Sequence, residues 1–322
     1  AFSRLANLPP EEGGSGLPAR VTMLWGESAQ RAAFVANEAH IHTVVDDPAR
    51  MLGQVDAVMV VLRHGAQHHD AALPFLRAGI STWVDKPFTT DIGQAAALVA
   101  AARESGALLA GGSTCKYCPD VLWLRDKYRA MCADGGVISA GLNFPGELDS
   151  PYGGLYFYGG HTAEILTTAF GPDIISVKAD VTAGNVIAVF KYASLGVCVN
   201  FAEVSEFHAA LYGAKEVAVH SIDISTIYRQ GFAKFVQGVL TRTPPEQIIS
   251  LASPPVRQAP ASFKKESSLM YSVWTGTCVT RTRAVTFFMG NKLLCKKHAR
   301  RPLEKVFHFF TNSNPLSGEP AK

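Results

Sequence analysis

The sequence predicts an α/β protein with a doubly wound parallel sheet, followed by an α+β domain with a mostly antiparallel open sheet. Up to about residue 111, short apolar strands alternate with helix-like segments, an order that produces a parallel sheet wrapped by helices with right-handed crossovers. Beyond Pro119, several strands follow one another across hairpin-length turns, which is typical of antiparallel pairing. The clearest strand covers residues 56–62, whose apolar run suits a parallel strand buried on both faces.

Hydrophobic spacing and capping residues define the elements of the first half. Phe2, Leu5 and Leu8 fit the last turns of a helix. Asp91 has the side chain of an N-cap, so a helix should begin directly after it. We therefore expect strands at 21–25, 41–45, 56–62, 79–84 and 107–111, and helices at 29–40, 48–53, 67–78 and 91–106.

The second half combines a few helices with β-branched and apolar strands. A helix over 120–133 should end at Gly135 and Gly136. Further helices are expected at 161–170 and 226–240, and strands at 137–144, 174–181, 185–192, 196–204, 206–212 and 215–222. These elements predict a first domain at 1–118, a second at 119–247 and a tail at 248–322.

The composition is that of a soluble globular protein. The chain has 322 residues, of which 48% are hydrophobic and 18% charged, enough for two domains. No apolar run reaches the roughly 20 residues that span a bilayer, and the first residues do not resemble a signal peptide, so we expect no membrane association. Six irregularly spaced cysteines suggest free thiols in the cytoplasm. The single C-x-x-C, Cys115 and Cys118, indicates two unlinked thiols rather than a metal or redox pair.

The balance of basic and acidic residues changes near residue 250. Residues 1–250 carry 18 Lys and Arg against 24 Asp and Glu, whereas residues 251–322 carry 12 against 3. One interpretation of this basic tail is an arm for nucleic acid or an acidic partner. The interpretation we favour is a disordered or non-native extension, because the tail lacks nucleic-acid-binding motifs. We therefore predict no nucleic-acid partner.

Lys86 is the first candidate for chemistry. The strand that contains Ile80, Trp83 and Val84 must stop at Pro87, because proline has no N–H for the ladder. Ligands of open α/β sheets bind at the carboxyl ends of strands, where Lys86 would lie. A lysine there can present a charge or a proton to a polar substrate, although an ordinary surface lysine would have the same local sequence.

Asp85-Lys86-Pro87 resembles the Glu-Lys-Pro after the fifth strand of the Gfo/Idh/MocA family of NAD(P)-dependent oxidoreductases. The resemblance covers residues 1–247. It implies a Rossmann-like cofactor domain, NAD or NADP as cofactor, and hydride transfer involving a hydroxyl-bearing small molecule such as a sugar or polyol. It places Asp85 and Pro87 at the cofactor, and Lys86 beside the nicotinamide and the reacting hydroxyl. In the family this proline typically follows a cis peptide bond.

Two other stretches carry the resemblance in the first domain. Residues 60–68 resemble the family's strand and Thr-Pro-Asn-x-x-His loop, which borders the nicotinamide. Only His68 matches that motif, and Arg63, His64 and Gly65 replace its usual residues. Residues 116–119, Lys-Tyr-Cys-Pro, resemble the Arg-Phe-x-Pro junction that leads into the second domain.

In the second domain, residues 153–161 resemble the family's Gly-Gly-x-Leu-x-Asp-x-Gly-x-His. The resemblance makes His161 the base that takes the hydroxyl proton, while Lys86 stabilises the same oxygen. Phe157 replaces the family's aspartate, and Tyr158 becomes a candidate substrate contact.

The resemblance also concerns assembly. Relatives commonly form dimers or tetramers through the open face of the second sheet, and we expect this chain to be a homo-oligomer. Val197, Val199 and Phe201 are expected on that outer face.

The N-terminal part of the sequence differs from the family's motif pattern. A dinucleotide fold needs a strand, a G-x-G-x-x-G turn and a helix, and no such stretch is present. Residues 21–25 resemble the family's second strand, with Glu27 close to the position of the ribose-binding acid. The sequence therefore predicts an N-terminally truncated fold without the first strand and glycine loop. Two alternatives remain open: a non-catalytic metabolite-binding or regulatory relative, and NAD-dependent glycoside cleavage.

Overall fold

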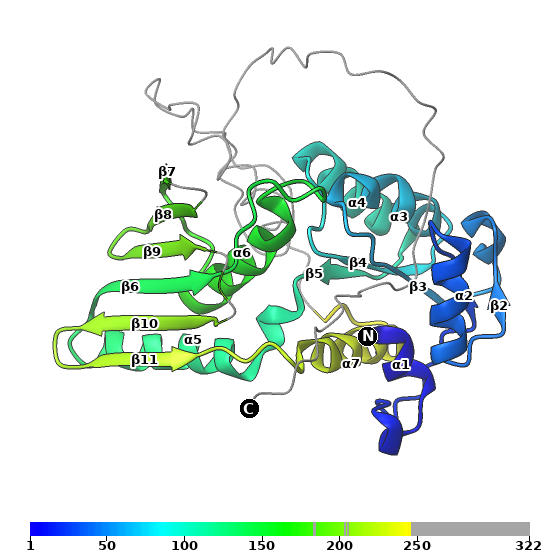
Figure 1. The fold of residues 1–322 in the computed structure, drawn as a ribbon, viewed down its shortest axis with the longest axis horizontal. Helices are drawn as coiled ribbons and strands as arrows, with labels where there is room; N and C mark the ends of the chain where they lie inside the picture. The colour runs from blue at the N-terminus through cyan, green and yellow to red at the C-terminus, as the bar shows by residue number, and fades with distance from the viewer. Residues whose placement is uncertain (183–184, 203, 205, 246–322) are drawn as a thin grey trace, which may run out of the picture.

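The computed structural model describes residues 1–182, 185–202, 204 and 206–245 (Figure 1). It confirms the predicted fold class, with parallel strands in the first half and a mostly antiparallel sheet in the second. The basic tail expected at 248–322 lies outside the described residues. Among the described residues, no helix is long and apolar enough to cross a membrane.

The parallel strands of the first half form two separate sheets. Strand β1 (Met23–Leu24) pairs with β2 (Thr43–Val44), and β3 (Ala57–Val60), β4 (Ser81–Asp85) and β5 (Leu109–Gly112) pair in that order. All these pairs are parallel, so the strand carboxyl ends within each sheet share one edge.

Helices cover both faces of the three-stranded sheet. Figure 1 shows α3 (His68–Arg77) and α4 (Ile92–Ser105) on one face, with α1 (Phe2–Asn7) and α7 (Ile227–Thr241) on the other. The remaining helical elements here are α2 (Ala29–Glu38) and the short turns η1 (Pro10–Glu12), η2 (Pro48–Met51) and η3 (Gly65–Gln67).

The ends of α4 confirm the sequence-based expectation. The Asp91 side chain accepts a hydrogen bond from the Gln94 N–H, as an N-cap does. Gly106 ends the helix with φ +74°, a conformation that glycine adopts without a steric cost.

Helix α7 joins the two halves although it comes last in the described chain. Its Phe235 packs edge-on against Trp83 of β4 at a ring distance of 5.9 Å. Phe2 of α1 contacts the same tryptophan at 6.3 Å and Phe232 of α7 at 6.3 Å. These aromatic contacts bury one face of the β4 strand, which ends at the candidate lysine.

The second half is built on a six-stranded sheet in the order β11-β10-β6-β9-β8-β7. The central pair, β6 with β9, is parallel, and the other pairs are antiparallel. Its helices are η4 (Thr114–Tyr117), α5 (Pro119–Ala133) and α6 (Tyr156–Phe170), and its strands are β6 (Val137–Phe144), β7 (Ser176–Thr182), β8 (Asn185–Lys191), β9 (Gly196–Phe201), β10 (His208–Gly213) and β11 (Val217–Ser221).

Helix α6 begins earlier than expected. It starts at Tyr156 rather than at His161 and therefore includes Gly159 and Gly160. Paired glycines disfavour a helix by about 1 kcal/mol each, so the sequence pattern predicted a start only after them. Burial of the helix against the sheet outweighs this local preference, since nine of its residues are buried.

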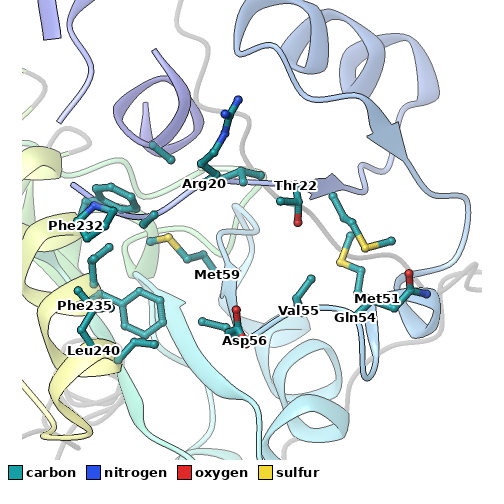
Figure 2. Close-up of a pocket in the computed structure, with 18 residues that line it drawn as sticks. Arg20, Thr22, Met51, Gln54, Val55, Asp56, Met59, Phe232, Phe235 and Leu240 are labelled. Carbon is teal, nitrogen blue, oxygen red and sulfur yellow. The ribbon is translucent and has the colours of Figure 1, made fainter. Parts of the chain in front are cut away.

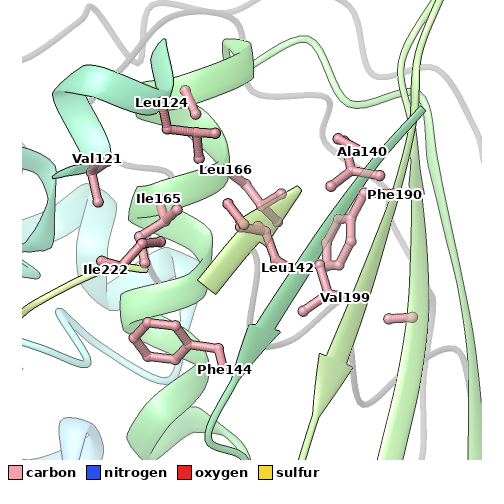
Figure 3. Close-up of a cluster of buried hydrophobic side chains, with 14 of the residues drawn as sticks. Val121, Leu124, Ala140, Leu142, Phe144, Ile165, Leu166, Phe190, Val199 and Ile222 are labelled. Carbon is pink, nitrogen blue, oxygen red and sulfur yellow. The ribbon is translucent and has the colours of Figure 1, made fainter. Parts of the chain in front are cut away.

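The expected outer face of β9 was wrong. Val197, Val199 and Phe201 are buried, with exposed fractions of 0%, 0% and 1%. Figure 3 shows Val199, with Phe144 and Phe190, among the buried side chains of the core packed against α6. Successive side chains on a strand point to opposite faces. The prediction assigned to the outer face the set of side chains that points into the core. The outer face instead exposes apolar side chains of neighbouring strands: Ile187, Val189, Tyr212, Val217 and Val219.

The packing of α6 gives a matched test of the core. Leu166 is completely buried in α6, and Leu240 in α7 is 57% exposed. We predict that Leu166→Ala lowers the free energy of unfolding by ~2–5 kcal/mol through loss of contacts and a residual cavity. Leu240→Ala should change it by less than about 0.5 kcal/mol. Urea denaturation measures both, and equal losses would contradict this packing.

Candidate active site

The candidate site lies where the carboxyl edge of the three-stranded sheet meets α6. Strand β3 leads to Arg63, strand β4 to Lys86 and strand β5 to Ser113. Helix α6 contacts both β5 and the η4 turn that follows it. Side chains from both halves of the chain therefore converge at this edge, as the parallel topology requires.

Lys86 is partly buried and points toward the start of α6. Its Nζ donates a hydrogen bond to the Phe157 carbonyl oxygen at 3.0 Å. The same atom lies 3.7 Å from the centre of the Phe157 ring and 5.6 Å from that of Tyr158. Phe157 thus contacts the lysine both through its carbonyl oxygen and through a cation–π contact with its ring. The Lys86–Pro87 peptide bond is cis.

The electrostatics of Lys86 follow from its surroundings. Burial lowers the pKa of Lys86 to about 8, and the nearby Asp85 carboxylate opposes this shift. Burial also raises the pKa of Asp85 to about 6, against the effect of Lys86. At neutral pH the two side chains are thus mostly in their charged forms, but each titrates much closer to neutrality than usual.

His161 lies inside α6 and is buried. Its Nδ1 lies 2.6 Å from Ser113 Oγ and 3.4 Å from Cys115 Sγ. Burial, and then the positive charge of Lys86, hold the pKa of His161 well below the usual 6.5. Burial raises the pKa of Cys115 to about 12, so its thiol stays protonated. His161 is therefore a neutral imidazole at physiological pH, as a general base must be.

Ser113 contacts His161, and the sequence did not predict this contact. It is fully buried at the end of β5, and its Oγ also accepts a hydrogen bond from the Cys115 N–H. No motif marks this serine, because its partner is 48 positions away in the sequence. Only the position of α6 over the sheet edge brings the two side chains together.

The loop after β3 contacts the second domain. Arg63 Nη1 donates to the Tyr152 hydroxyl at 2.5 Å and lies over the same ring. His64 Nδ1 accepts the Ala66 N–H and so caps η3. Gly65 packs so closely on the β4 turn that a Cβ there would lie 2.8 Å from the Pro87 carbonyl oxygen. The three residues expected to border the nicotinamide therefore lie beside Pro87 and the second domain.

His68 is fully buried beneath this loop. Its Nδ1 lies 2.7 Å from the Pro87 carbonyl oxygen, and its Nε2 lies 2.9 Å from that of Leu62. Burial lowers its pKa to about 4, although these carbonyl oxygens oppose the shift. The ring links the ends of β3 and β4, which supports a role in positioning Lys86.

Two expected contacts lie at the rim. Glu27 is exposed just beyond β1, and its Oε1 accepts a hydrogen bond from Gln67 Nε2 at 3.3 Å. Tyr158 is partly buried, with its ring 5.0 Å from that of Phe157 and 6.4 Å from that of His161. Glu27 and Tyr158 thus come from different domains, Glu27 from the loop after β1 and Tyr158 from α6.

A buried ion pair between η4 and α6 lies close to the site. Lys116 of η4 lies 3.4 Å from Glu164 of α6, and its Nζ also donates to the Gly111 carbonyl oxygen at 2.6 Å. A Cβ at Gly112 would lie 2.2 Å from the Glu164 carboxylate, so only glycine fits there. Because Glu164 is one helical turn from His161, this pair fixes the helix that carries the histidine.

The residues fit one part of a nicotinamide dinucleotide. At the proposed reacting end, the cationic Lys86 follows β4 and the neutral His161 lies on α6, groups that suit nicotinamide chemistry, whereas Glu27 follows β1 in the separate two-stranded sheet. The pyrophosphate end is different: in the described part of the chain, no strand leads through a glycine-rich turn into α1. The described residues therefore fit the proposed reacting end, and they include no phosphate cradle of this form.

The first domain of the chain is similar in sequence to known proteins. Residues 6–113 match the model of the Gfo/Idh/MocA oxidoreductase family, NAD-binding Rossmann fold. The UDP-N-acetylglucosamine 3-dehydrogenase of Acidithiobacillus ferrooxidans is 34% identical over 102 residues, which are 32% of this chain and 32% of that protein. The match thus spans about a third of the length of this curated relative.

Solved structures extend the similarity in fold to both domains. The GenD2 protein of gentamicin A biosynthesis, in complex with NAD, has a TM-score of 0.62 and 15% identity, covering 86% of this chain and 88% of its own. The myo-inositol 2-dehydrogenase of Lactobacillus plantarum has a TM-score of 0.64 and 12% identity, covering 76% and 87%. Residues 6–113 thus match the NAD-binding Rossmann fold of the Gfo/Idh/MocA oxidoreductases, and the solved structures show the same fold over both domains.

Proposed function

We propose that the protein is an NAD(P)-dependent oxidoreductase that moves hydride between the nicotinamide and a hydroxyl-bearing carbon of a sugar, polyol or related metabolite. The observation that carries this proposal is the convergence of Lys86 and His161 at one sheet edge, where burial and then the lysine charge lower the histidine pKa. The similarity to a UDP-N-acetylglucosamine 3-dehydrogenase supports sugars as the first substrates to try.

The proposed chemistry divides between the two side chains. Lys86 in its ammonium form donates a hydrogen bond to the substrate oxygen and stabilises its negative charge as the hydride leaves. His161 takes the hydroxyl proton at Nε2, while its Nδ1–H donates to Ser113 Oγ. When bound, the nicotinamide supplies the hydride acceptor. Tyr158 is proposed to contact the substrate from α6.

A binding-only function is the second candidate. The observation in its favour is that the Lys86 ammonium already contacts the Phe157 ring and donates a hydrogen bond to the Phe157 carbonyl oxygen. A substrate hydroxyl would have to share or replace these contacts. Turnover that depends on Lys86 would exclude this candidate.

We also propose that the protein is a cytoplasmic homo-oligomer. The exposed apolar side chains on the outer face of the second sheet, including Ile187, Val189 and Val219, support self-association through that face. Whether it forms a dimer or a tetramer follows from its mass in solution.

The first prediction concerns turnover. We expect Lys86→Met to lower kcat/KM by at least ~10²-fold with NAD⁺ and a productive sugar or polyol, because the transition-state oxygen loses its hydrogen-bond donor. His161→Asn should reduce the rate across the whole pH range. Absorbance of the reduced nicotinamide measures both, over a substrate panel that includes UDP-N-acetylglucosamine and myo-inositol.

The matched control is Lys178→Met, which removes an exposed lysine of β7 and should leave kcat/KM unchanged. A Lys86→Met protein that is folded and fully active would refute the assignment.

The second prediction concerns pH. Because Lys86 must be protonated and its pKa is about 8, kcat/KM should fall as the pH rises through about 8. Phe157→Asp places a carboxylate beside Lys86, raises the lysine pKa and should move this alkaline limb to higher pH. Phe157→Leu removes only the cation–π contact and should move the limb to slightly lower pH.

An alkaline limb that stays in place in both Phe157 variants would show that Lys86 does not govern it. Circular dichroism of each variant across the same pH range separates titration of the site from loss of the fold.

A further inference from the structure

His161 is held through one of its two ring nitrogens. The polar contacts that the structure describes for the ring are both at Nδ1, which lies 2.6 Å from Ser113 Oγ and 3.4 Å from Cys115 Sγ. In a neutral imidazole only one nitrogen carries hydrogen, and the hydrogen bond at one nitrogen decides the state of the other. The partner of Nδ1 therefore decides whether Nε2 is free to accept a proton.

Among the described contacts of His161, none is with a carboxylate, although a carboxylate orients the imidazole in Ser-His-Asp triads. Phe157 lies four residues before His161, one helical turn away on the same face of α6. Its ring and carbonyl oxygen contact the Lys86 ammonium. The Glu164 carboxylate, on the next turn, pairs with Lys116 of η4. The groups that hold the ring are therefore neutral ones from outside α6.

Ser113 is the stronger of the two partners. Its Oγ lies at a short hydrogen-bond distance from Nδ1, whereas a thiol is a weak donor and a weak acceptor. Ser113 is fully buried and caps η4, where its Oγ accepts the Cys115 N–H at 3.0 Å. Ser113 also hydrogen-bonds the Cys115 side chain, which opposes the rise in the thiol pKa that burial causes. With its hydrogen directed at Sγ, the hydroxyl oxygen can accept both the Cys115 N–H and the Nδ1–H of His161.

The segment that carries Ser113 is fixed by its neighbours. Helix α7 packs against η4, and a Cβ at Gly231 of α7 would lie 2.2 Å from Thr114 Cγ2. Phe232 and Phe235 of the same helix instead project toward a separate cavity of about 400 Å³ beside β1 and β3, which the candidate site residues do not line (Figure 2). The serine hydroxyl is thus presented to Nδ1 by a closely packed backbone.

We propose that Ser113 is a positioning residue for the proposed reaction: its hydroxyl oxygen accepts the Nδ1–H of His161 and so keeps Nε2 without hydrogen and turned toward the substrate. The serine takes the place that a carboxylate has in the triads. This proposal rests on the proposed function, because it concerns the base of that reaction. In the opposite arrangement the hydroxyl would donate to Nδ1, and the hydrogen on Nε2 would leave no position for the substrate proton.

The test is ¹⁵N NMR of the full chain labelled in its histidines, at neutral pH and without cofactor. A ring nitrogen that carries hydrogen and one that does not have clearly different ¹⁵N shifts, so the spectrum reports the tautomer directly. The chain has 10 histidines, and the His161 signals are those that His161→Asn removes. We expect hydrogen at Nδ1 in the unmodified chain. Hydrogen at Nε2 instead would overturn the proposal.

The matched control is Cys115→Ala, which removes the other group near Nδ1. The ratio of Nδ1–H to Nε2–H should fall by about 10-fold in Ser113→Ala, because one hydrogen bond to the ring is lost. It should stay unchanged in Cys115→Ala and recover in Ser113→Thr, which keeps the hydroxyl. A ratio that falls in Cys115→Ala and not in Ser113→Ala would also overturn the proposal.

Kinetics separate this role from the proposed function. With a substrate that the chain turns over, Ser113→Ala should lower kcat by about 10-fold and change KM by less than about 2-fold, because Ser113 acts through His161. Equal kcat in Ser113→Ala and the unmodified chain would remove the role of Ser113 and leave Lys86-dependent turnover intact. A chain that turns over no substrate would count against the proposed function alone, and the NMR result would still decide the tautomer.

Discussion

The contact between the partly buried Lys86 ammonium and Phe157 of α6 is the interaction on which the site depends. A charge in this position needs partners, and the structure provides them from both domains: Asp85 from its own strand, and the Phe157 carbonyl oxygen and ring from α6. Burial, and then the same charge, hold the pKa of His161 well below its usual value, so the imidazole is neutral. The Lys86 side chain therefore links the end of β4 to the start of α6 and contributes to the acid–base state of the site.

Much of the fold could be predicted from the sequence because its signals are local. The continuous apolar run of β3 and the Asp91 cap of α4 depend only on neighbouring residues. Which face of β9 is buried depends on where α6 packs, a long-range property that alternation alone does not specify. The start of α6 was missed because tertiary burial compensates for Gly159 and Gly160.

In the candidate site, too, local signals could be predicted from the sequence and long-range contacts could not. The motif around Lys86 placed the lysine at a strand end, and the structure agrees. The contact between Ser113 and His161 had no sequence signal, because it joins side chains from different domains. His68 matched a motif expected at the cofactor, yet its ring lies in the interior and contacts main-chain oxygens.

The most direct test of the central claim, that this sheet edge binds a nicotinamide dinucleotide, is a titration of the full chain with NADH. The readout is energy transfer from tryptophan to the nicotinamide, since Trp25 follows β1 and Trp83 lies on β4. The account predicts saturable transfer that NAD⁺ displaces. Transfer that rises linearly up to millimolar NADH, and that NAD⁺ does not displace, would contradict it.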